Sequence, residues 1–271
     1  MTPLTLTPLQ KIPLIRHGDN LADILVSSLQ TSEIELQDDD ILVLAQKIVS
    51  KTEGRMVNLA TVTPSQRAKE LAEKTEKDAR VVELMLQESN EVLRVRVGTI
   101  IVEHKLGFVC ANAGIDHSNV AGTGDENKEY VLLLPENPDR SAKNIRDEIK
   151  KSTGKKIGVM IIDSHGRAWR IGTEGVCIGL SGIPAVIDER GWKDLFGYTL
   201  RVTQVGVADE LAAVGVRQAG DPQHRAGDRP SGAVPVGHAV VQHRVRGIAR
   251  RGDRRDRVRL GAARPTAGDA R

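Results

Sequence analysis

Two apolar stretches of the sequence each lead directly into short polar side chains that include an aspartate. Residues 107–110 continue through an Asn-containing turn to Asp116, and residues 157–162 continue into Asp163 and Ser164. Hard divalent cations take oxygen ligands, and Mg²⁺ is commonly held by one or two carboxylates together with substrate phosphates. The alternative is that both aspartates only cap turns. The residues alone leave both interpretations open.

Two lysines follow a third apolar run. Residues 41–45 have the length and composition of a buried strand, and they lead straight into Gln46, Lys47 and, one helical turn later, Lys51. The lysines can be ordinary solvated surface residues. They can also contact phosphate, because ammonium groups that leave a buried strand are well placed to neutralise a nucleotide.

Four further polar residues lie close to the two aspartates in the sequence. Asn119 is a neutral donor suited to a phosphate or a base edge. Arg167 and Arg170 can bind an anionic substrate, because a guanidinium group pairs bidentately with carboxylate or phosphate. A lone histidine such as His165 is more often a structural polar residue than a ligand.

Several helices and strands must position these residues. Apolar periodicity predicts helices over 20–29, from 63 to about 88, over 141–151 with Gly154 as a terminator, and from 208 onward. In the second of these, Thr63 is expected to cap the helix and Pro64 to occupy its first position. Strands are predicted at 41–45, 92–97, 131–134, 157–162 and 200–207, with a hairpin formed by residues 100–102 and 108–110.

Length and composition exclude some classes of protein. A chain of 271 residues allows one large domain or two small ones with a buried core. It contains no run of 18 apolar residues, so we expect no membrane helix, and residues 1–14 lack the charged start and apolar stretch of a secretory signal. Cys110 and Cys177 lie in apolar runs, which predicts buried free thiols and a cytoplasmic location.

The last 58 residues differ in character from the rest. Residues 1–213 contain 14 Lys and 12 Arg against 31 acidic residues, whereas residues 214–271 contain 13 Arg, no Lys and 5 Asp. The tail can be a disordered basic arm for nucleic acid, a linker, or a GC-rich gene segment translated out of frame. The sequence favours the last, because the apolar pattern of the helix that begins at Ala208 stops after Ala213. Nucleic acid is not an expected partner, since the tail has no aromatic residues for base stacking.

The motifs together resemble the coenzyme F420:L-glutamate ligase family (F420-0:gamma-glutamyl ligase). Each matching segment alone would be weak, but they occur in family order and cover residues 10 to 213, which makes the set specific. The segments are 12–15 with Gly18 and Asp19, 45–55, 112–120, 163–167, 179–182, 194–197 and 208–210.

The resemblance implies a fold of the α/β class with mixed α+β sheets, in an intertwined homodimer and not a Rossmann or P-loop domain. It implies that GTP and Mg²⁺ or Mn²⁺, with K⁺ as a further ion, serve to add L-glutamate to the lactyl carboxylate of coenzyme F420-0, in some members repeatedly. By motif, the GTP-contacting positions are Ile12, Pro13, Leu14, Ile15, Gln46, Lys47, Lys51 and Asn119. The metal-binding positions are Asp116, Asp163 and Ser164.

The sequence also departs from the family. Ser164 and His165 stand where some members have Thr and Asn. After residue 213 nothing matches the family's glycine-rich loop, which contacts GTP and supplies a metal ligand. This leaves three alternatives to an active ligase domain over residues 1–213: a catalytically inactive relative, a nucleic-acid-binding protein that uses the basic tail, and a ligase domain that has lost a fused second domain.

Overall fold

The computed structural model describes residues 4–118, 120, 129–166, 168–220 and 239–243, with the backbone alone for residues 216–220 and 239–243. The chain forms two compact units. The larger one comprises the described residues up to Ala60 and from Ile115 onward, and the smaller one comprises residues 61–114. The stretch around Asn112 and Asp116 is therefore divided between the two units.

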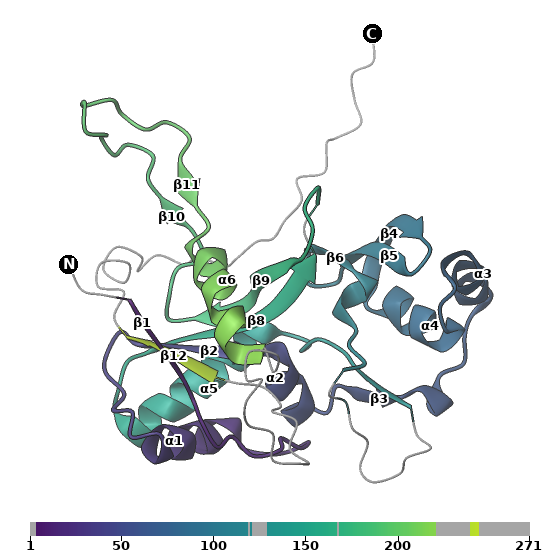
Figure 1. Cartoon of the computed structure of the whole chain (residues 1–271), viewed down its shortest axis with the longest axis horizontal. Coiled ribbons are helices and arrows are strands. Elements are labelled where there is room, and N and C mark those ends of the chain that lie inside the picture. The colour runs from purple at the N-terminus through teal and green to yellow at the C-terminus, as the bar shows by residue number, and fades with distance from the viewer. Residues whose placement is uncertain (1–3, 119, 121–128, 167, 221–238, 244–271) are drawn as a thin grey trace, which may run out of the picture. The chain divides into compact units, whose positions relative to one another are not determined.

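A five-stranded mixed sheet forms the centre of the larger unit (Figure 1). Its middle strands β2 and β8 are parallel, and every other neighbouring pair is antiparallel. This confirms the expected class with mixed sheets. In spatial order the strands are β1 (Thr5–Pro8), β12 (Ala239–His243), β2 (Ile41–Ala45), β8 (Gly158–Gly166) and β9 (Thr173–Ser181).

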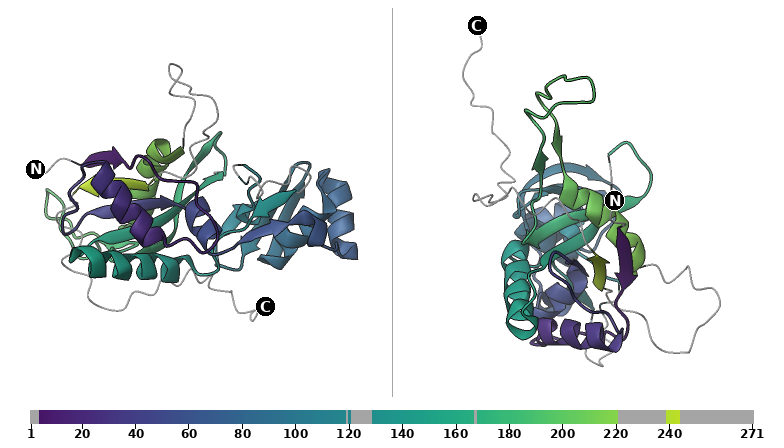
Figure 2. Two further views of the ribbon diagram at one scale, coloured as in Figure 1. Left: turned by 90° about the horizontal axis from the view of Figure 1, so that it is seen from below. Right: turned by 90° about the vertical axis from the view of Figure 1, so that its left-hand side faces the viewer.

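Helices cover both faces of this sheet, which explains why β2 and β8 are apolar without alternation. Helix α6 packs on one face through Val207 and Leu211, which contact a core that contains Val43 and Met160. Helix α5 lies on the opposite face (Figure 2). The helices of this unit are α1 (Leu21–Thr31), α2 (Gln46–Thr52), α5 (Pro138–Thr153) and α6 (Val207–Gly220).

Most predicted elements of this unit are present. Asn20 caps α1, and Gly154 follows α5 with a φ of 74°, in the left-handed conformation that glycine tolerates. The predicted strand 200–207 is wrong over most of its length: only β11 (Gln204–Val205) is a strand, paired with β10 (Ile187–Asp188) in a separate hairpin. Two short antiparallel strands, β3 (Met56–Asn58) and β7 (Tyr130–Leu132), and the 3₁₀ helix η1 (Leu59–Thr61) complete the described elements.

The smaller unit packs helices against a three-stranded antiparallel sheet. The predicted hairpin is confirmed as β5 and β6, but the helix predicted from 63 to 88 is two helices. The first helix is capped by Ser65, not Thr63, and ends at Glu76, which has a φ of 55°. The side chain of Asp78 caps the second helix. The elements are α3 (Gln66–Thr75), α4 (Ala79–Gln87), β4 (Ser89–Arg96), β5 (Thr99–His104), β6 (Val109–Ala111) and the 3₁₀ helix η2 (Asn112–Gly114).

Two described segments of the C-terminal part form regular structure. Helix α6 extends through Gly220, although the apolar pattern predicted an end near Ala213. Strand β12 lies between β1 and β2 and pairs with both.

None of the helices in the described ranges is long and apolar enough to span a bilayer. Neither cysteine forms a disulfide; Cys110 is buried, and Cys177 is partly exposed.

Candidate active site

The parallel pairing of β2 and β8 brings two of the predicted site segments to one edge of the sheet. Ala45 and Ile162 are partners in the register, so Gln46 and Asp163 follow directly from paired residues. Neighbouring strands lie about 4.8 Å apart. The first turn of α2, which carries Gln46 and Lys47, therefore begins beside the acidic end of β8.

Lys47 joins this edge to the second predicted aspartate. Its Nζ lies 2.6 Å from Asp116 Oδ2 and donates a 2.6 Å hydrogen bond to Ser118 Oγ. Asp116 Oδ1 in turn accepts bonds from Ser118 N at 2.7 Å and from Ser118 Oγ at 2.8 Å. The network fixes a carboxylate, a hydroxyl and an ammonium group next to one another.

Charge and burial shift the pKa values of two groups here. Burial acts to raise the pKa of Asp116, but the hydrogen bonds from Lys47 and Ser118 outweigh it, and the pKa lies below its ordinary value. The pKa of Lys51 is lowered, first by burial and then by repulsion from Lys47, with Asp116 opposing the shift. Two half-buried lysines therefore lie near one carboxylate, an arrangement that suits a phosphate ligand bound together with a cation.

Gln46 is the most deeply buried of the predicted site residues. Its side chain is 1% exposed, and Ser50 Oγ donates a 2.8 Å bond to its Oε1. Its Nε2 has no hydrogen-bond partner within the described parts of the chain. A buried amide donor without a partner lowers the stability of the folded protein by about 1–3 kcal/mol. A ligand oxygen that accepts a hydrogen bond from Nε2 would remove this penalty.

Asp163 and Ser164 both belong to β8, but the structure separates their side chains. Asp163 is half-buried, and its Oδ2 lies 3.1 Å from His165 Nε2. Ser164 is exposed, and successive side chains of a strand point to opposite faces of the sheet. His165 thus has a structural partner, in agreement with the expectation for a lone histidine.

The remaining predicted residues lie in coil or outside the described residues. Residues 12–15 are coil; Ile15 is buried and Leu14 is exposed. Their segment continues to Gly18, whose N–H donates to Thr52 O at the end of α2. Asn119 and Arg167 lie outside the described residues, and Arg170 is exposed.

The donor groups fit a cation that is shared with a phosphate ligand. Within the described ranges, no three His, Cys, Asp or Glu side chains gather around one point. Two carboxylates near one sheet edge nevertheless match the one or two that Mg²⁺ takes when phosphates supply further ligands. Asp116 and Asp163 are the residues here that would hold it, whereas the Ser164 side chain lies on the opposite face of the strand from Asp163.

Sequence reasoning missed the role of Ser118, whose main-chain and side-chain groups both bind Asp116. The signal was its position two residues after an aspartate, where Asx turns form.

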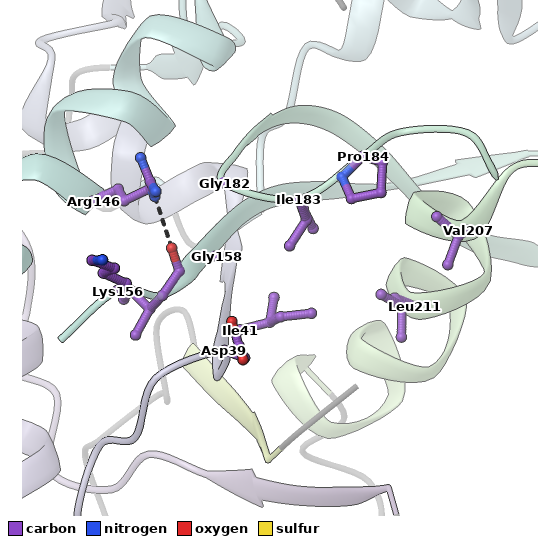
Figure 3. Close-up of a pocket in the computed structure, with 11 residues that line it drawn as sticks. Asp39, Ile41, Arg146, Lys156, Gly158, Gly182, Ile183, Pro184, Val207 and Leu211 are labelled. Carbon is purple, nitrogen blue, oxygen red and sulfur yellow. Dashed lines mark hydrogen bonds between the residues drawn. The ribbon is translucent and has the colours of Figure 1, made fainter. Parts of the chain in front are cut away.

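Two cavities have none of the predicted site residues in their lining. One, of about 200 Å³, opens at the other edge of the sheet, where Ile41 and Gly158 begin β2 and β8 (Figure 3). Another, of about 210 Å³, lies among α1, α2 and α5 and is lined partly by Asp19, Glu53 and Glu148.

Comparison with known sequences identifies the family. The profile of the F420-0:Gamma-glutamyl ligase family matches residues 10–223. Over 206 residues the chain is 43% identical to the coenzyme F420:L-glutamate ligase of Methanocaldococcus jannaschii, covering 75% of this chain and 78% of the relative. It is 44% identical over 208 residues to the protein of the same name from Methanopyrus kandleri, covering 76% and 78%. The protein of that name from Archaeoglobus fulgidus is 44% identical over 207 residues, again covering 76% and 78%. With such matches over three quarters of its length, the chain belongs to the F420-0:Gamma-glutamyl ligase family.

Proposed function

We propose that this protein is a GTP-dependent ligase that adds L-glutamate to the lactyl carboxylate of coenzyme F420-0. The observation that carries the proposal is the network of Lys47, Asp116 and Ser118, with Lys51 beside it. It combines clustered positive charge for phosphates with a carboxylate that stays ionised for a cation. The names of the relatives supply the acceptor and the amino acid.

The proposed reaction has two steps. An oxygen of the acceptor carboxylate attacks the γ-phosphorus of GTP, the bond from that phosphorus to the β–γ bridging oxygen breaks, and GDP leaves. The amine of glutamate then attacks the acyl carbon, the bond to the phosphate oxygen breaks, and phosphate leaves while the amine loses a proton. Phosphoryl transfer depends mostly on positioning and charge neutralisation, and these are what the site residues can provide.

Each site residue has a proposed task. Lys47 and Lys51 neutralise the phosphates, and Asp116 and Asp163 would hold Mg²⁺ or Mn²⁺. When bound, that cation would offset charge on the transferred phosphoryl group. Residues 12–15, Gln46 and Asn119 bind the nucleotide. We assign no ligands to the expected K⁺; replacing potassium by sodium salts in the assay tests whether activity needs it.

The decisive assay measures GDP release. We expect release only when GTP, the deazaflavin acceptor and L-glutamate are all present. Absence of release from protein that binds GTP–Mg²⁺ tightly would reject the ligase activity, and absence of both would support the inactive relative. Sequencing the gene across the codons for residues 205–220 then shows whether another reading frame restores the family's glycine-rich loop.

We also propose that the hairpin of β10 and β11 joins two copies of the chain. The hairpin extends away from the sheet (Figure 1) and has an ordered tip, where Asp194 Oδ1 accepts the N–H groups of Phe196 and Tyr198. Leu195 and Phe196 are 97% and 95% exposed at that tip. Exposed apolar groups on an ordered turn are typical of an interaction site, and the family's intertwined dimer supplies the partner.

Sedimentation equilibrium tests the dimer. We expect Phe196→Asp to yield monomers, whereas Val97→Asp, at another exposed apolar residue, should not change the mass. A monomeric wild-type protein would contradict the proposal.

A further inference from the structure

Aromatic residues are rare in this chain and are largely kept out of its core. The sequence has two Phe, two Trp and two Tyr. None of the six is among the buried hydrophobic residues, which are aliphatic, alanine, methionine or cysteine. Trp192, Phe196 and Tyr198 lie on the β10–β11 hairpin, and Trp169 lies on the hairpin formed by β8 and β9. Exposed aromatic groups that the core does not need are available for contact with ligands or partners.

The tip of the β8–β9 hairpin is the more unusual of the two. Gly166 and Thr173 close the ladder, and Trp169 and Ile171 beyond it are both 99% exposed. Trp169 has a φ of 61°. A bulky residue in the left-handed region is uncommon, and strained backbone of this kind clusters at ligand-binding sites.

The tip continues the strand that carries a proposed cation ligand. Asp163 precedes Gly166 on β8 by three residues, which at a rise of about 3.3 Å per residue is about 10 Å along the strand, and Trp169 follows in the turn that β8 enters. The acceptor in the proposed reaction has a comparable separation between its ring and its reacting group. Its flat deazaflavin ring lies at one end, its reacting carboxylate lies at the other, and an anionic chain joins them.

We propose that Trp169, with Ile171 beside it, is the stacking platform for the deazaflavin ring, and that Arg170 between them pairs with the acceptor's anionic chain. This inference rests on the proposed ligase function and deepens it, because it assigns the residues that select the acceptor. An indole face, a guanidinium group and an aliphatic side chain in succession match a ring followed by an anion.

A stacking platform has a kinetic signature. The ring is far from the reacting atoms, so the platform binds it equally in the ground state and the transition state. Such uniform binding affects KM and leaves kcat unchanged. Loss of one stacking contact with a heteroaromatic ring typically weakens binding about tenfold.

The first experiment measures acceptor KM and kcat for three variants. We expect Trp169→Ala to raise KM about tenfold with kcat unchanged, and Trp169→Phe to recover most of the loss because it keeps an aromatic face. Val97→Ala is the control at an exposed apolar residue outside both hairpins, and its KM should equal that of the wild type. An unchanged KM in Trp169→Ala overturns the proposal, as does a Trp169→Ala protein that dissociates into monomers, because the tip is then a subunit contact.

A second experiment needs no turnover. Trp192→Phe leaves Trp169 as the only tryptophan, and saturating acceptor should then protect its fluorescence lifetime from acrylamide quenching. Trp169→Phe leaves Trp192, which should show no protection. Protection without GDP release from the wild type would reject the ligase function and retain the platform, whereas GDP release without protection would reject the platform alone.

Discussion

Lys47 Nζ lies 2.6 Å from Asp116 Oδ2, and both side chains are only about a quarter exposed or less. The same carboxylate is a proposed cation ligand. A cation at Asp116 would compete with the lysine, so binding of a nucleotide with its cation would release the Lys47 ammonium group toward the phosphates. In the absence of a ligand, Lys47 and Asp116 therefore pair with each other. In the proposed complex, both would instead contact the nucleotide and its cation.

Asp116→Asn tests that relationship. The amide cannot supply the negative charge for a cation, and even the outer partners of a metal site contribute 10–100-fold to affinity. We expect GTP affinity in the presence of Mg²⁺ to fall by about 100-fold or more, measured by calorimetry. Asp147→Asn removes a surface carboxylate that pairs with Lys143 and is the matched control. Equal GTP–Mg²⁺ affinity in the Asp116→Asn and wild-type proteins would remove Asp116 from the site.

Gln46→Leu separates binding from stability. The substitution removes the buried Nε2 donor that has no partner among the described residues, while Ser50 Oγ can turn to a backbone carbonyl of its own helix. We expect the free energy of unfolding to change by less than about 1 kcal/mol, and GTP affinity to fall about tenfold if Nε2 donates to the nucleotide. Urea unfolding and calorimetry measure the two effects. A large loss of stability with unchanged affinity would show that Gln46 is structural.

The lowered pKa of Lys51 predicts that GTP binding weakens with alkaline pH. The phosphates favour the protonated amine, so binding takes up a proton wherever free Lys51 is partly deprotonated. Because burial and Lys47 lower its pKa below the ordinary value for a lysine, affinity should begin to fall at a lower pH than an exposed lysine would give. Lys51→Arg stays charged throughout and should flatten the profile. Identical profiles for the two proteins would refute the assignment.

The sequence predicted the structure best where the pattern of apolar residues along the chain directly reflects burial in the fold. The continuous apolar runs before Gln46 and Asp163 required strands buried on both faces, and their parallel register then brought both residues to one edge. The pattern could not show that Lys47 reaches Asp116, because that contact depends on how distant segments of the chain pack. The break at Glu76 escaped prediction, because apolar periodicity continues across it and only the cap at Asp78 marks a new helix.

The hairpin formed by residues 187–205 shows a second limit of prediction from sequence. Residues 200–207 have strand propensity, but only Gln204 and Val205 form a regular strand, which pairs with β10. The remainder of the hairpin is held by backbone hydrogen bonds between its arms, such as Leu200 N to Trp192 O, and by turn hydrogen bonds around Asp194. Likewise, the composition of the tail gave no indication that β12 would lie inside the central sheet.

Gly182→Ala is expected to destabilise the larger unit. Gly182 has a φ of 84°, and a Cβ there would lie 2.4 Å from Arg146 Nε and 2.7 Å from Ile157 O, the two groups joined by a hydrogen bond in Figure 3. Gly172 also has a positive φ, of 93°, but faces open space. We expect Gly172→Ala to cost about 1 kcal/mol and Gly182→Ala about 2–4 kcal/mol in urea unfolding. Equal costs would mean that Arg146 moves away freely.

Strand β12 predicts a difference between two truncated proteins. Residues 239–243 pair with β1 on one side and β2 on the other, so a chain that ends at Gly220 loses both ladders and exposes an edge of β2. A chain that ends at His243 keeps them. We expect the shorter protein to melt at least about 5 °C lower, which corresponds to roughly 2 kcal/mol for a chain of this size. Equal melting temperatures would show that the tail, whatever its origin in the gene, adds no stabilising strand to the sheet.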